Sequence, residues 1–255
     1  MLQIQPLLSE KERWMALAKR EDICFELIEP SMTHGLTKQS NGEEYISAYR
    51  DSGLVRSLHG AFIDMNAASG DPEIRRLSRE RIRKSCALAN KLGVDRIVLH
   101  SSAFPFLRDG YLEGWVETCE AFYRDIAREY GLTICVENSF DLDPEPLLRL
   151  MRRCDDPNIR ICLDIGHAHY SRAGIERWFE DLGQYIACIH LSDNMGQFDD
   201  HLPLGEGTVD WAMADKLWSG LGKKDMPITL EVGGCEKVER SMAYLRSHSY
   251  FGMGE

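Results

Sequence analysis

Long hydrophobic runs, paired-cysteine motifs and an excess of basic residues are all absent from this chain of 255 residues. No stretch of about 18 consecutive apolar residues occurs, so we expect no membrane span. Because there is neither a CxxC pair nor a basic-then-apolar leader segment, we expect the eight cysteines to be reduced thiols in a cytoplasmic protein. The net charge of -11 disfavours a broadly basic nucleic-acid surface, although it leaves room for a local basic groove.

Nucleotide-binding and nucleophile motifs are also missing. The chain has no glycine-rich dinucleotide fingerprint, no phosphate-binding loop and no Ser/His/Asp pattern in a supporting context. Its composition, 44% hydrophobic and 28% charged, is that of an ordinary globular protein. No linker or low-complexity tract divides it, which favours one domain over residues 1–255.

Strand-like and helix-like patterns alternate from one end of the chain to the other. The strand-like runs are short and apolar, as in a parallel sheet covered on both faces. Strands are expected at 2–5, 23–27, 55–59, 95–100, 133–137, 159–164, 186–191 and 227–232. Helices are expected at 9–19, 42–51, 71–92, 113–130, from 143, at 174–182, at 211–221 and up to about 246. Eight such units predict an α/β protein that is a single (β/α)8 TIM barrel.

Acidic residues and histidines end the strand-like runs, at the end where the active sites of such barrels are built. Glu137, Asp164, His190 and Glu231 end four successive runs, and we expect them to converge on one point. Buried carboxylates brought close together repel unless a cation joins them. Three carboxylates and one imidazole suit Mn²⁺, Mg²⁺ or Co²⁺ and tolerate Zn²⁺. The alternative is that these residues merely cap exposed strand ends.

Five more residues of the same kinds stand near this set. Two end the third and fourth strands, one follows Asp164 by three positions, and two lie in the loop after the seventh strand. They either hold up to two further metal ions or bind substrate hydroxyls and support the loops. These residues are His59, His100, His167, Asp199 and His201.

Several stretches resemble the xylose-isomerase-like TIM barrels, a superfamily of sugar isomerases and epimerases, dehydratases and endonuclease IV-type apurinic-site nucleases. They include LHGAFIDMN, VLHSSAF, VENSF, LDIGHAH, HLSDN and DDHLPLGEGTVDW, and the resemblance covers nearly the whole chain. The isomerase branch implies one divalent metal held by Glu137, Asp164, His190 and Glu231, with the two glutamates exchanging a proton between neighbouring carbons. The nuclease branch implies three zinc ions held by all nine residues.

Departures from the nuclease branch favour the small-molecule branch. Nuclease members follow the first histidine with a loop that carries a tyrosine, whereas this chain reads HGAFIDM, with Phe62. HSS stands here in place of the nuclease-like HPG after the fourth strand. The segment 28–42 has one lysine and no arginine for phosphate contacts, and its His34 is a candidate to line the pocket.

Charge counting bears on the same choice. One divalent ion with three carboxylates and a neutral histidine carries about -1, which suits a neutral sugar, whereas three zinc ions with all nine residues carry about +2, which favours a phosphate ester. We therefore predict a divalent-metal-dependent isomerase or epimerase of a small carbohydrate or sugar-derived ketone. Glu137 and Glu231 would be its acid–base pair, and the proton transfer would pass through an enediolate.

Three other functions stay open. The first is a trinuclear zinc phosphodiesterase acting at abasic DNA, and the second is a metal-dependent dehydratase or lyase. The third is a sugar-binding or regulatory protein on the same barrel. The expected partner is a small-molecule carbohydrate, nucleic acid is not favoured, and the sequence leaves open whether the chain forms a homo-oligomer.

Overall fold

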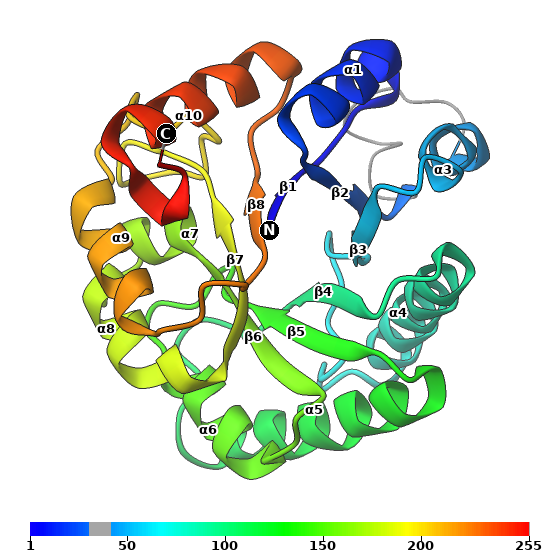
Figure 1. Ribbon diagram of the computed structural model, residues 1–255. Helices are drawn as coiled ribbons and strands as arrows, with labels where there is room; N and C mark the ends of the chain where they lie inside the picture. Colours follow the sequence, from blue (N-terminus) through cyan, green and yellow to red (C-terminus); the bar gives the residue numbers. More distant parts are fainter. Residues whose placement is uncertain (31–41, 255) are drawn as a thin grey trace.

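Eight parallel strands close into a barrel, in chain order from β1 to β8 (Figure 1). The computed structural model describes residues 1–30 and 42–254, so His34 and most of the segment 28–42 lie outside the described residues. Each strand pairs in parallel with the next, and β1 pairs with β8 to close the ring. The predicted fold class, an α/β protein with a single TIM barrel, is confirmed.

The strands are short because each crosses the barrel wall once. Most of their residues are buried, since the helices cover one face and the barrel interior covers the other. The strands are β1 (Leu2–Ile4), β2 (Cys24–Ile28), β3 (Val55–His59), β4 (Arg96–His100), β5 (Thr133–Glu137), β6 (Ile159–Asp164), β7 (Ile186–Leu191) and β8 (Ile228–Leu230).

The expected eighth strand is shorter than predicted. It ends at Leu230, so Glu231 lies one residue beyond β8. The backbone N–H of Glu231 still donates to the carbonyl of Leu191 at 3.0 Å, so the residue keeps its place beside β7.

The helices form an outer layer around the ring of strands (Figure 1). Asp71 caps one of them by accepting from the N–H groups of Glu73 and Ile74, with Pro72 in its first turn. The helices are α1 (Lys11–Glu21), α3 (Gly42–Arg50), α4 (Pro72–Leu92), α5 (Asp109–Tyr130), α6 (Glu145–Cys154), α7 (Ile165–Tyr170), α8 (Ile175–Leu182), α9 (Trp211–Gly220) and α10 (Cys235–His248). None of the helices in the described segments is both long and apolar enough to cross a membrane.

Two helices differ from the sequence-based expectation. Helix α5 begins at Asp109 rather than at 113. The prediction placed its start too late because Gly110 and Gly114, in its first turns, have low helix propensity. Helix α7 was not predicted. It is a single short segment that Asp164 initiates, since its carboxylate accepts the N–H of His167 at 2.6 Å.

The core has an outer and an inner part. The larger part fills the space between strands and helices and includes Trp14, Trp178 and Trp211. A small cluster inside the barrel consists of Val98, Cys135, Cys162 and Cys188. All eight cysteines are free thiols.

Candidate metal centre

The candidate ligands form the layer directly above the small side chains inside the barrel. Because side chains on a strand alternate between its two faces, the residue two positions after an inward residue also points inward. Five candidate ligands follow an inward residue of this kind by two positions. The pairs, in strand order, are Ser57 and His59, Val98 and His100, Cys135 and Glu137, Cys162 and Asp164, and Cys188 and His190.

The four residues expected to converge do so. One ligand atom from each of Glu137, Asp164, His190 and Glu231 lies within 4.8 Å of the others. His190 Nδ1 is 3.0 Å from Glu137 Oε1 and 2.9 Å from Glu231 Oε2. Glu137, Asp164 and His190 are at most 1% exposed, so two carboxylates and an imidazole meet in a water-poor site.

Asp164 is held in place by its neighbours. Asn138 accepts the Asp164 N–H at 2.8 Å and donates its side-chain amide to the Asp164 carbonyl at 3.0 Å. Asp164 Oδ1 accepts from His167, whereas Oδ2 is buried without a donor among the described residues. Burial raises the pKa of Asp164 to about 7. A buried carboxylate oxygen that lacks a donor is the kind of atom a cation satisfies.

A second group adjoins the first at Glu137. The other oxygen of this carboxylate, Oε2, is 3.0 Å from His59 Nε2 and 3.4 Å from His100 Nε2. His59 Nδ1 lies 3.1 Å from the carbonyl of Gly60 and donates there, which leaves Nε2 to face Glu137. The ligand atoms of His59, His100 and Glu137 lie within 4.8 Å of one another, which is a metal-like spacing.

The remaining three outer residues form a more exposed group. Asp199 Oδ2 lies 3.3 Å from His167 Nε2 and 2.9 Å from His201 Nε2. Both histidines place Nδ1 at 2.6 Å from a backbone carbonyl, that of Asn138 for His167 and that of Glu231 for His201. Asp199 and His201 have side-chain exposures of 39% and 34%, so this group faces the mouth of the barrel.

Without a metal, protons neutralise the carboxylates. Burial lowers the pKa of His59, but Glu137 and other carboxylates outweigh it and raise that pKa to about 9. For His201, the carboxylates of Asp199 and Glu231 outweigh burial and raise the pKa to about 10. His100 differs, because burial dominates and lowers its pKa to about 4. A cation that binds here takes the place of such protons, as expected of a metal site.

Residues 21–248 match the model of the xylose isomerase-like TIM barrel family. The chain belongs to this family. Within it, the chain is similar to the crystal structure of a D-tagatose 3-epimerase-like protein, with 26% identity, a TM-score of 0.77 and coverage of 96% of this chain and 95% of that one.

The chain is also similar to two curated proteins. The uncharacterized protein MJ1311 of Methanocaldococcus jannaschii is 30% identical over 180 residues, which are 66% of this chain and 61% of that protein. The chain therefore spans less than two thirds of that relative's length. A probable endonuclease 4 of Thermoplasma acidophilum is 23% identical over 231 residues, covering 82% of this chain and 79% of that protein.

Sequence reasoning missed Glu26, a buried carboxylate beneath the site of this xylose isomerase-like barrel. It is 1% exposed on β2, and its Oε1 lies 3.0 Å from His190 Nε2, off the line of a hydrogen bond. Ser57 Oγ donates to Glu26 Oε2 at 2.8 Å, and Gln5 Nε2 donates to Oε1 at 3.1 Å. The signal was present in the sequence as a lone carboxylate inside the apolar run ICFEL.

Proposed function

We propose that this protein is a divalent-metal-dependent isomerase or epimerase of a ketose or sugar-derived ketone. The observation that carries the proposal is the convergence of Glu137, Asp164, His190 and Glu231, with Asp164 Oδ2 buried and without a donor among the described residues. The similarity to a D-tagatose 3-epimerase-like protein supports the same class of substrate.

The donor set fits a divalent ion of moderate hardness. Three carboxylates and one imidazole suit Mn²⁺, Mg²⁺ or Co²⁺ and accept Zn²⁺, and His190 would use Nδ1, the nitrogen that faces Glu137 and Glu231. When bound, such an ion supplies Lewis-acid polarisation of neighbouring carbonyl and hydroxyl oxygens of the substrate.

Glu137 and Glu231 are the residues placed to move protons. Glu137 ends β5 and Glu231 follows β8, so they approach the site from different sectors of the barrel, and yet both reach His190 Nδ1. One carboxylate takes the proton of a carbon next to the carbonyl, and the other returns a proton to the neighbouring carbon or to the opposite face of the same carbon. In the metal-free site, burial raises the pKa of Glu231, but the charge on His190 outweighs it and brings the pKa down to about 2, so this carboxylate is ionised.

The test is solvent-deuterium exchange into a panel of ketohexoses by the metal-loaded protein. Wild-type protein is expected to place deuterium on the carbon next to the carbonyl and to form the isomer or epimer. Glu137→Gln and Glu231→Gln are each expected to lower turnover by at least 10³-fold, because each removes one partner of the proton transfer. Glu12→Gln, an exposed change on α1, is the matched control. Unchanged turnover in either glutamine variant would sink the assignment.

The spacing of His59, His100 and Glu137 favours one rival, the trinuclear phosphodiesterase. Glu26 adds one negative charge to the site under both the one-ion isomerase and the three-ion phosphodiesterase. One divalent ion with Glu26, Glu137, Asp164 and Glu231 carries about -2, whereas three ions with those four and Asp199 carry about +1. The one-ion site therefore repels a phosphate diester. The rival predicts three tightly bound zinc ions and cleavage of an abasic oligonucleotide, and one ion without cleavage excludes it.

A further inference from the structure

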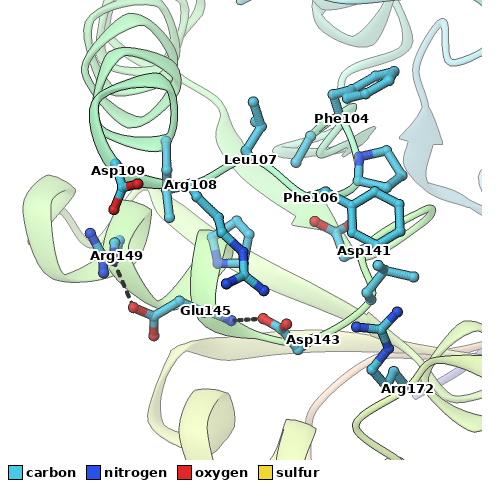
Figure 2. Close-up of a pocket in the computed structure, with 15 residues that line it drawn as sticks. Phe104, Phe106, Leu107, Arg108, Asp109, Asp141, Asp143, Glu145, Arg149 and Arg172 are labelled. Carbon is cyan, nitrogen blue, oxygen red and sulfur yellow. Dashed lines mark hydrogen bonds and ion pairs between the residues drawn. The ribbon is translucent and has the colours of Figure 1, made fainter.

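A cavity of about 300 Å³ lies among the segments that follow β4, β5 and β6 (Figure 2). It is lined by the loop after β4 and the start of α5, by the loop after β5 and α6, and by Arg172 in the loop between α7 and α8. The strands β4, β5 and β6 lead into these segments, and they carry His100, Glu137 and Asp164. The cavity thus lies beyond the carboxyl ends of three strands that also carry candidate ligands, and its volume falls at the lower end of small-molecule sites.

One residue, Ser101, links the cavity to the candidate ligands. Its N–H donates to the Glu137 carbonyl at 2.8 Å, and its hydroxyl donates to Asp141 Oδ2 at 2.6 Å. The Ser139 N–H donates to the same oxygen at 3.0 Å. Asp141 lines the cavity, is 6% exposed, and its other oxygen, Oδ1, has no partner among the described residues. The Asp141 carboxylate is therefore fixed in the wall of the cavity by Ser101 and Ser139.

Aromatic rings supply the apolar part of the cavity. Phe104 and Phe106 line it with exposures of 71% and 67%, which is unusual for such large apolar side chains. The Arg172 guanidinium lies 5.7 Å from the centre of the Phe106 ring. Phe106 holds this position with φ at +71°, a conformation that costs a bulky residue energy, as is found where a side chain is aimed at a ligand.

Two arginines supply hydrogen-bond donors. The guanidinium groups of Arg108 and Arg172 have no hydrogen bond or ion pair within the described ranges, whereas that of Arg149 pairs with Glu145 at 2.7 Å. Figure 2 shows Arg108 reaching across the cavity from the loop after β4 toward Asp143 and Glu145. Three arginines and four carboxylates line the cavity in all, so its charge does not favour a phosphate or another anion.

We propose that this cavity is a subsite for a second, neutral glycosyl ring, so that the substrate is a ketose carrying a glycosyl substituent. The apolar C–H face of a pyranose packs on a phenylalanine ring, and its hydroxyls find donors on Arg108 and Arg172. The inference rests on the proposed function for the ketose part, which the metal centre receives. The glycosyl part is recognised by the cavity alone.

The experiment compares lactulose, a ketose that carries a galactosyl ring, with D-fructose, the same ketose without it. Calorimetric titration of the metal-loaded protein is expected to show lactulose binding at least tenfold more tightly. Phe106→Ala should remove this advantage and leave D-fructose binding unchanged. Tyr111→Ala should keep it, because Tyr111 is 83% exposed on α5 and does not line the cavity.

A metal-independent probe separates the two proposals. Methyl β-D-galactopyranoside lacks a ketone, so saturation-transfer NMR should detect its binding in metal-free protein and lose it in Phe106→Ala. If it binds while D-fructose does not bind the metal-loaded protein, the subsite stands and the proposed function fails. Equal affinity for lactulose and D-fructose overturns the subsite, as does a cavity that binds inorganic phosphate in place of the galactoside.

Discussion

Glu26 is expected to control metal affinity although it is not one of the proposed ligands. Its carboxylate lies 3.0 Å from His190 Nε2, the ring nitrogen opposite the one that faces Glu137 and Glu231. Carboxylates behind a ligating histidine fix its orientation and raise its basicity, and losing one typically weakens metal binding about 10–100-fold. Glu26→Gln also replaces one carboxylate oxygen by an NH₂ group. Either Ser57 or Gln5 then faces a donor where it had an acceptor. We therefore predict a loss of about 1.4–2.7 kcal/mol in metal-binding free energy.

The measurement is a competition titration of metal-free protein with Mn²⁺ or Zn²⁺ against a fluorescent chelator. Glu12→Gln makes the same chemical change at an exposed position on α1 and should bind within twofold of wild type. Ser57→Ala keeps the carboxylate but removes one of its donors, so its effect should lie between the two. If Glu26→Gln binds metal as tightly as wild type while its unfolding temperature falls, Glu26 supports only the fold, and our account of its role is wrong.

Three further perturbations follow from the site. Asp141 has its pKa raised by burial from 3.8 to about 6. Between these pH values the folded state keeps a proton that the unfolded state has lost, so this group's contribution to stability is complete below pH 4 and falls by up to about 3 kcal/mol as the pH rises through 6. Urea unfolding of Asp141→Asn from pH 4 to 8 should lack this fall relative to wild type, and parallel curves would refute it. Asn138→Ala leaves the N–H and carbonyl of Asp164 without their partners and should lower the free energy of unfolding by about 2–3 kcal/mol, whereas a loss below about 0.5 kcal/mol would contradict the role given to this amide. Adding Mn²⁺ or Zn²⁺ at 100 times its dissociation constant should stabilise the protein by about 2.7 kcal/mol, a rise of about 5–11 °C in unfolding temperature that a chelator reverses.

The barrel was predictable because its signal is repeated. Eight short apolar runs alternate with helical patterns, and each run that ends in a histidine or carboxylate brings that residue to the same mouth. The convergence of Glu137, Asp164, His190 and Glu231 follows from this topology, since parallel strands in a closed ring all point their carboxyl ends the same way. Predicting that these four residues meet did not require knowing how neighbouring strands are shifted relative to one another.

What the sequence hid depends on side-chain direction and on loops. Glu26 lies in the middle of β2, below the layer of candidate ligands. A search for residues at strand ends therefore misses it. Its meeting with His190 joins strands on different sides of the barrel, which no local pattern encodes. The cavity beside Asp141 is built largely from loop residues, where sequence periodicity is absent, and Gly110 concealed the early start of α5.

The most direct test is anomalous diffraction from crystals of metal-loaded protein, together with metal analysis of the same sample. Our account predicts one ion per chain, bound by Glu137, Asp164, His190 and Glu231, with His190 using Nδ1. Three ions that also engage His59, His100 and Asp199 would contradict the sugar isomerase and support a phosphodiesterase. A chain that binds no divalent ion at these four residues would overturn the central claim.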